Sequence, residues 1–263
     1  MHEPLTSLQN PKVKELIRWQ AKSRQRIKDQ VIIVEGIKEN QLALQSGLHA
    51  QKFFVQEGLF HHQIQLPQKS IIYTVSSTVF ERIAYRGTTG GIIGIYSAPN
   101  RQLEDFSWTA PSLFMVLESV EKPGNLGAVL RSADAAAATA VIICDPKTDI
   151  FNPNVVRSSL GTVFTTPVFT CTTQEWLEYA EKHAINNFAT HLNADSVSLY
   201  SQNYTQNTAF ILGTESTGLT DQWINQGHTI IKIPMQGSID SLNVSNAAAI
   251  CLFEAVRQRE VGH

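Results

Sequence analysis

The chain has 263 residues, of which 43% are hydrophobic and 17% are charged, and its formal net charge is −2. This is enough for two compact domains with ordinary cores, and the near-neutral charge argues against indiscriminate binding to nucleic acid. Because the sequence has no run of 18 apolar residues and no basic-then-apolar leader, we expect a cytoplasmic protein that is neither secreted nor membrane-spanning.

The first 30 residues are unusually basic, with seven Lys or Arg against three Asp or Glu. We predict a helix near residues 12–28 that docks through Val13, Leu16, Ile17 and Ala21. Four cations recur every four residues along its other face: Lys14, Arg18, Lys22 and Arg26. Such a row of like charges costs roughly a few tenths of a kcal/mol per pair. It is either a solvated surface or a contact for phosphate groups.

Short strands and helices alternate along the rest of the chain. In the first part we predict strands at residues 31–34, 53–56, 71–75 and 91–97, and helices at 38–46 and 78–85. In the second part we predict strands at 113–117, 140–144, 188–191, 209–212 and 229–233, and helices near 154–160, 173–183 and 244–257. The breakers Pro99, Asn100, Ser107 and Pro111 indicate a linker. We therefore expect domains at residues 1–98 and 112–263, a linker at 99–111, and an α/β fold with a parallel sheet.

Polar residues follow three of the predicted strands in the second part. One junction carries Asn125, Gly127 and Arg131, the next carries Gly213, Glu215 and Gly218, and the last carries Ser241, Asn243 and Ser245. In open α/β sheets ligands bind at the carboxyl ends of the strands, so three such junctions favour one composite site. Two simpler interpretations stay open: Asn243 or Ser245 caps the last helix, and Glu215 accepts local backbone hydrogen bonds.

Other kinds of site find little support. Three cysteines, Cys144, Cys171 and Cys251, lie at wide spacing in apolar runs, which is typical of core packing. His61, His62 and His191 lack partners at metal-ligand spacing, so we interpret them as surface or packing residues and predict no metal. The chain has neither GxGxxG nor GxxxxGK[ST], which removes the main support for a dinucleotide oxidoreductase or a nucleotide triphosphatase.

The three junctions together resemble the motifs of the SpoU (TrmH-like) branch of the SPOUT RNA methyltransferases. The matching residues are Asn125, Leu126, Gly127 and Arg131, then Gly213, Glu215, Gly218 and Leu219, and finally Ile233, Pro234, Met235, Ser241, Leu242, Asn243, Val244 and Ser245. The resemblance covers residues 112–259, with Thr214 standing where many relatives carry asparagine. It implies a C-terminal trefoil knot and, more weakly, an L30e-like substrate-binding domain at the N-terminus.

The resemblance also implies the site and its chemistry. Gly213, Ile233, Met235 and Leu242 are expected to hold S-adenosylmethionine, and Asn125, Arg131, Glu215, Ser241 and Asn243 to form the catalytic set. The family places Arg131 at the reacting ribose. Since the pKa of arginine lies above about 12, we favour charge stabilisation and phosphate anchoring over a role as general base.

We therefore expect an RNA 2′-O-ribose methyltransferase that acts on ribosomal RNA of the 23S type as a homodimer. With this partner, the basic helix is interpreted as a contact for RNA phosphates. Two alternatives remain, a transfer RNA methyltransferase and a catalytically silent RNA-binding SPOUT protein.

Overall fold

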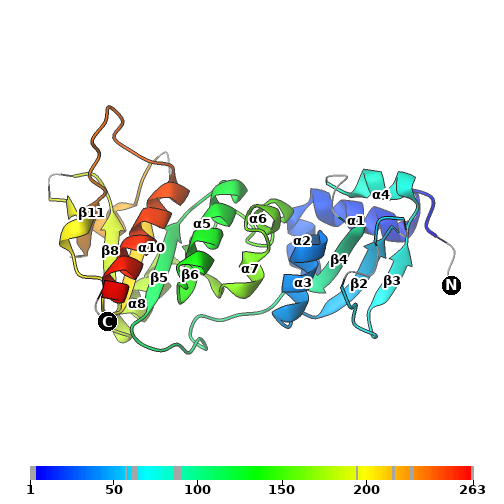
Figure 1. Ribbon diagram of the computed structural model, residues 1–263, viewed down its shortest axis with the longest axis horizontal. Helices are drawn as coiled ribbons and strands as arrows, with labels where there is room; N and C mark the ends of the chain where they lie inside the picture. The colour runs from blue at the N-terminus through cyan, green and yellow to red at the C-terminus, as the bar shows by residue number, and fades with distance from the viewer. Residues whose placement is uncertain are drawn as a thin grey trace. The chain divides into compact units, whose positions relative to one another are not determined.

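The computed structural model describes residues 4–56, 58–60, 64–85, 90–193, 195–214, 217–224 and 228–261. The chain divides into two compact units, and Figure 1 labels many of their helices and strands. Unit 1 comprises Met1–Asn100 and Asp149–Thr165, and unit 2 comprises Arg101–Thr148 and Thr166–His263. This division differs from the boundaries expected from the sequence, which assigned residues 149–165 to the second domain.

Unit 1 is built on a four-stranded sheet in the order β1-β4-β2-β3. β1 (Val31–Glu35) and β2 (Ala50–Val55) run antiparallel to β4 (Ile92–Ser97), and β3 (Ile71–Thr74) runs parallel to β2. Its helices are α1 (Pro11–Ala21), α2 (Ser23–Asp29), α3 (Ile37–Gln45), α4 (Ser77–Ile83), α6 (Pro153–Ser158) and α7 (Thr162–Thr165). Because α6 contacts β1 and α7 contacts α3, the segment 149–165 belongs to this unit.

The expected single helix near residues 12–28 is wrong, because the chain breaks at Lys22, which has extended backbone between α1 and α2. α1 docks through Val13, Leu16 and Trp19, all buried in the core of unit 1. Ile17 and Ala21, which were expected to dock, are exposed instead. The indole N–H of Trp19 donates to the carboxylate of Asp29 at 2.7 Å, which ties the end of α2 to α1.

Unit 2 contains a seven-stranded parallel sheet in the order β7-β6-β5-β10-β8-β11-β9. The strands are β5 (Leu113–Glu118), β6 (Ala140–Cys144), β7 (Val168–Cys171), β8 (Asn186–Thr190), β9 (Val197–Ser198), β10 (Thr208–Leu212) and β11 (Thr229–Lys232). The helices are α5 (Pro123–Ala135), α8 (Thr173–Lys182), α9 (Asp221–Ile224) and α10 (Val244–Val261), with a short 3-10 turn at Leu199–Ser201. Helices α5 and α10 lie side by side in Figure 1 and contact each other.

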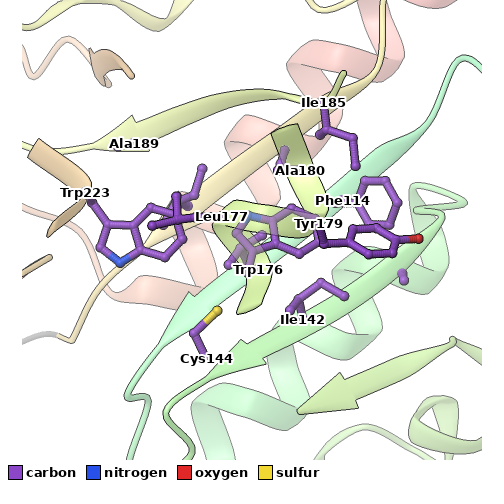
Figure 2. Packing of buried hydrophobic residues seen from close by; sticks show 14 of the residues in the cluster. Phe114, Ile142, Cys144, Trp176, Leu177, Tyr179, Ala180, Ile185, Ala189 and Trp223 are labelled. Atoms are coloured by element: carbon purple, nitrogen blue, oxygen red, sulfur yellow. The ribbon is translucent and has the colours of Figure 1, made fainter. Parts of the chain in front are cut away.

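Aromatic side chains form much of the core of unit 2. Figure 2 shows Trp176 and Tyr179 of α8 lying close to Phe114 of β5, and the rings of Phe114 and Trp176 meet edge-on at 5.4 Å. Trp108, from the expected linker, packs against Phe114, and its indole N–H donates to the hydroxyl of Tyr179 at 2.9 Å. Part of that segment is therefore anchored to unit 2.

The α/β class and the parallel sheet predicted from the sequence are confirmed. Several elements were not predicted, namely the strands β7 and β9 and the one-turn helices α7 and α9. They are short, so their apolar periodicity is weak. All three cysteines are free thiols, and Cys144 and Cys251 are buried. In the described part of the chain, no helix has the length and apolar character needed to cross a membrane.

Candidate functional site

The carboxyl ends of β8, β10 and β11 surround a cavity of about 530 Å³, which we call the strand-end pocket. The long loop from β11 to α10 completes its wall. The lining residues are 190–192, 212–214, 218, 231–233, 235, 240–244 and 247. Parallel strands all end at one sheet edge, so segments far apart in the sequence meet there.

The four residues expected to bind the cofactor, Gly213, Ile233, Met235 and Leu242, all line this pocket. Two of the expected catalytic residues, Ser241 and Asn243, line it as well. Ser241 is exposed, and its hydroxyl donates to the carboxylate of Asp240 at 3.1 Å. The second and third junctions of the sequence thus share one cavity.

The loop after β10 is closed by its own backbone. Thr214 and Gly218 exchange two backbone hydrogen bonds of 3.2 and 3.0 Å. A Cβ at Gly213 would lie 2.2 Å from the backbone of Gly218, so any side chain there would push the loop open. Gly218 has φ of +68°, a conformation that glycine adopts without strain. Glu215, one of the expected catalytic residues, lies outside the described residues.

Asn243 has two structural roles. Its side-chain oxygen accepts from the backbone N–H of Ser245 at 2.9 Å and from the Ser245 hydroxyl, so it caps α10 as the simpler interpretation predicted. Its Nδ2 also donates to Oδ1 of Asn125 at 3.3 Å. The same residue therefore starts the last helix and connects the third junction to the first.

The first junction forms the start of a helix. α5 begins at Pro123, which places Asn125 and Gly127 within its first turns. Arg131 lies farther along α5 and is exposed. Neither Asn125 nor Arg131 lines the strand-end pocket, so Asn125 reaches it through Asn243.

Sequence reasoning missed two residues at this edge. Glu118, the last residue of β5, is only 3% exposed, and its carboxylate accepts from the backbone N–H and the hydroxyl of Thr220 at 2.9 and 2.7 Å. It thereby holds the end of the loop that contains Gly213 and Gly218. His191 lines the strand-end pocket, although we interpreted it as a surface or packing residue. A carboxylate directly after an apolar strand was the available signal for Glu118.

The predicted RNA-binding cations separate into two groups. Lys14, Arg18 and Lys22 are exposed. Arg26 is 3% exposed, and its guanidinium donates to Asp149 at 2.8 Å and to the carbonyl of Trp19. Its assignment to an exposed basic face is wrong, because the break at Lys22 turns it inward toward a carboxylate. In the described ranges, no three His, Cys, Asp or Glu side chains gather as a metal site would require.

Comparison with protein families agrees with this geometry. Residues 112–253 match the model of the SpoU rRNA Methylase family, and residues 10–94 match an MRM3-like substrate binding domain. The chain belongs to the SpoU rRNA methylase family. The matched range contains all three junctions and every residue that lines the strand-end pocket.

Several known proteins are similar to this chain in sequence or in structure. A 23S rRNA (guanosine-2'-O-)-methyltransferase RlmB of Pseudomonas putida is 39% identical over 57% of this chain and 61% of its own length. A 23S rRNA (uridine(2479)-2'-O)-methyltransferase of Streptomyces viridochromogenes is 32% identical over 65% of this chain and 61% of its own length. The chain thus aligns with about three fifths of each. The crystal structure of an AdoMet-bound rRNA methyltransferase from Sinorhizobium meliloti is 29% identical, with a TM-score of 0.88 and 97% of both chains covered.

Proposed function

We propose that this chain is an S-adenosylmethionine-dependent RNA 2′-O-ribose methyltransferase that acts on ribosomal RNA. The observation that carries the proposal is the hydrogen bond between Asn125 and Asn243 at the rim of the strand-end pocket. It joins the first and third junctions beside a cavity lined by Gly213, Ile233 and Leu242. Ligand-sized cavities are roughly 300–1,000 Å³, and the 530 Å³ of this pocket falls within that range.

The pocket suits an adenosine-containing sulfonium cofactor. At Gly213 two backbone segments approach so closely that a Cβ would lie 2.2 Å from Gly218, so the backbone itself forms this part of the pocket wall. Ile233, Met235 and Leu242 add apolar surface for a purine ring. When bound, S-adenosylmethionine supplies a methyl group activated by a positively charged sulfur.

The remaining residues have roles on the RNA side in this proposal. Arg131 anchors the neighbouring phosphate and stabilises the negative charge that develops on the ribose oxygen. Asn125 and Asn243 orient the ribose, with Ser241 beside them at the pocket rim. Glu215 positions Arg131 or the ribose. This set holds the hydroxyl in line with the methyl group, which is where most of the rate gain of a two-substrate reaction arises.

Ribosomal RNA is the substrate we propose because residues 10–94 match a substrate-binding domain and the SpoU relatives above are named for 23S rRNA. Lys14, Arg18 and Lys22 of the first unit contact its phosphates in this proposal. Work on ribosomal RNA also implies a cytoplasmic location.

We also propose a homodimer with a trefoil-knotted C-terminal segment, as the family resemblance implies. α10 supports the dimer, because its large apolar side chain Phe253 is 47% exposed.

The test is incubation of the purified protein with labelled S-adenosylmethionine and separate pools of unmodified ribosomal and transfer RNA, followed by nucleoside analysis. We expect 2′-O-methyl nucleosides from ribosomal RNA. Label only in transfer RNA would keep the chemistry and reject the substrate. Cofactor binding without transfer to either pool would favour the binding-only alternative.

A further inference from the structure

Unit 1 contains a second cavity, of about 730 Å³, which we call the Tyr85 pocket. It lies between the start of α3, the end of α4 and the start of α6. It shares no residue with the strand-end pocket. Its size is within the roughly 300–1,000 Å³ typical of ligand sites, so it is large enough for a nucleotide.

An aromatic ring and a guanidinium are stacked at this cavity. The guanidinium carbon of Arg157 lies 4.0 Å from the ring centre of Tyr85, and Arg157 is held there by Asn154, whose side-chain oxygen accepts at 2.7 Å. Tyr85 is nevertheless 62% exposed, so its side chain is not part of the hydrophobic core. Its backbone N–H donates to both carboxylate oxygens of Glu35 at 2.8 and 3.0 Å, which fixes its position.

The charges around the ring are also informative. Lys38, Arg82 and Arg157 line the cavity against two carboxylates, Glu35 and Glu39. Both carboxylates face the chain itself, since Glu35 accepts from Tyr85 and the carboxylate of Glu39 lies over Gly36. The exposed side chains of Lys38 and Arg82 are therefore available for an anion at the rim.

Building on the proposed function, we propose that the Tyr85 pocket binds an unpaired nucleotide of the RNA substrate. The base stacks on the Tyr85 ring. Because every base has a π face, this contact does not depend on which base is bound. Side-chain amides of Gln20 and Asn152 line the same cavity and offer donors and acceptors for a base edge. Lys38 and Arg82 contact the flanking phosphate.

The Tyr85 pocket is formed by residues from two distant parts of the sequence. Arg157 and Asn154 come from α6, within residues 112–253 that match the SpoU family, whereas Tyr85 lies within residues 10–94 that match the substrate-binding domain. The stacked pair therefore needs both matched ranges. A substrate-binding domain cut at residue 100 would lack the guanidinium that orders Tyr85.

The test uses the full-length protein, without cofactor, and a short single-stranded RNA that carries one 2-aminopurine, a base whose fluorescence falls when it stacks on an aromatic ring. We expect quenching with wild type and with Tyr85→Phe, and no quenching with Tyr85→Ala. Loss of one stacked base should weaken RNA binding by about 5- to 150-fold. The slope of affinity against salt should stay unchanged, because Tyr85→Ala removes no charge.

Tyr200→Ala is the matched control, since Tyr200 is 55% exposed and lines neither cavity. It should bind and quench as wild type does. Equal binding and quenching by Tyr85→Ala, or no quenching with wild type, would overturn the Tyr85 pocket whether or not the protein transfers methyl groups. Free adenosine monophosphate and unlabelled RNA are each tested for displacement of the labelled RNA. If both displace it at the same concentration, the pocket would be reassigned to a free nucleotide. Thermal melting shows whether each variant is folded. Arg157→Ala is an independent second variant, and we expect it to weaken RNA binding and to reduce quenching.

Discussion

Asn243 and Asn125 are separated by 118 residues in sequence and are joined by a hydrogen bond of 3.3 Å between their side-chain amides. Because Asn243 also caps α10, and Asn125 lies in the first turn of α5, the bond fixes the starts of two packed helices relative to each other. The side chains of Asn125 and Asn243 therefore position both the rim of the strand-end pocket and the first turns of α5 and α10.

Capping and bridging by Asn243 can be separated with Asn243→Ser. Serine caps helices about as well as asparagine, but its side chain is too short to reach Asn125. We expect an unchanged melting temperature and a roughly tenfold loss of methyl transfer, the size expected for one hydrogen bond. Asn243→Ala should show the same loss of transfer and, in addition, about 1 kcal/mol less stability. Full activity in the serine variant would mean that the bridge has no part in the reaction.

Arg131→Ala should abolish methyl transfer and leave the affinity for S-adenosylmethionine within a few fold. Arg131 is exposed and does not line the strand-end pocket, so neither the core nor the cofactor wall changes. Isothermal titration gives the affinity, and single-turnover transfer to ribosomal RNA gives the rate. Arg131→Lys, which keeps the charge and loses the planar fork, should retain partial activity. Normal transfer by the alanine variant would remove Arg131 from the chemistry.

Thr220→Val tests the bond that holds the loop after β10. It deprives the buried Glu118 carboxylate of a hydroxyl donor at 2.7 Å, and hydrogen bonds to charged groups contribute about 1.5–3 kcal/mol. We expect a loss of stability of about that size and, because the loop contains Gly213 and Gly218, weaker binding of S-adenosylmethionine in a titration. Thr220→Ser keeps both donors and should behave as wild type. If the valine variant binds the cofactor normally, the loop does not depend on Glu118.

Arg18 and Arg26 should respond differently to the same change. Arg26→Ala leaves the largely enclosed carboxylate of Asp149, whose side chain is 10% exposed, without its ion-pair partner, and should cost about 3–5 kcal/mol in urea unfolding. Arg18→Ala, on the exposed face of α1, should leave stability within about 0.5 kcal/mol.

The exposed cations should act on RNA instead. Combined reversal of Lys14, Arg18 and Lys22 to glutamate should weaken RNA binding and lower its salt slope by roughly one for each phosphate that the protein no longer binds. Cofactor binding serves as the control and should not change. An unaltered salt slope would return these residues to a solvated surface.

Stability should fall in acid partly through Glu254. Its carboxylate accepts from Arg257 at 2.8 and 2.9 Å and from Gln258 at 2.8 Å, and these bonds hold the pKa of Glu254 below its ordinary value of 4.5, with Arg257 the largest cause. The folded pKa is the lower one, so the stabilisation is present above the ordinary value and is lost as pH falls through the folded value. As pH falls from about 7 through 4.5 to about 3, urea unfolding of wild type should lose more free energy than that of Glu254→Gln. Parallel losses would contradict this assignment.

The sequence predicted local features well and distant pairings poorly. The apolar runs of β5, β6 and β10 identify buried parallel strands, and the polar residues after them identify the sheet edge that carries the pocket. The period-four row of cations, by contrast, did not reveal that Arg26 turns inward, because its partner Asp149 is 123 residues away. Glu118 and Thr220, separated by 102 residues, were missed for the same reason.

Motif spacing had a similar limit. It indicated that Gly213, Ile233 and Leu242 belong to one site, and in the structure all three line the strand-end pocket. It gave no indication of the Tyr85 pocket, whose walls come from four separate stretches of the chain, around residues 20, 33–39, 82–90 and 152–157. Each stretch by itself contains only ordinary helix ends and turns. The combination of Tyr85 with Arg157 is formed only by folding, so no local sequence pattern predicts it.

The position of β8 bears on how the protein matures. Its two neighbours in the sheet, β10 and β11, both follow it in the sequence. During synthesis, β5, β6 and β7 have emerged as a pairable set while β8 still lacks both partners. The pocket edge is thus completed only when the last strand and α10 have left the ribosome. A nascent chain released after residue 165 but before β10 would contain all of the first unit and no strand-end pocket.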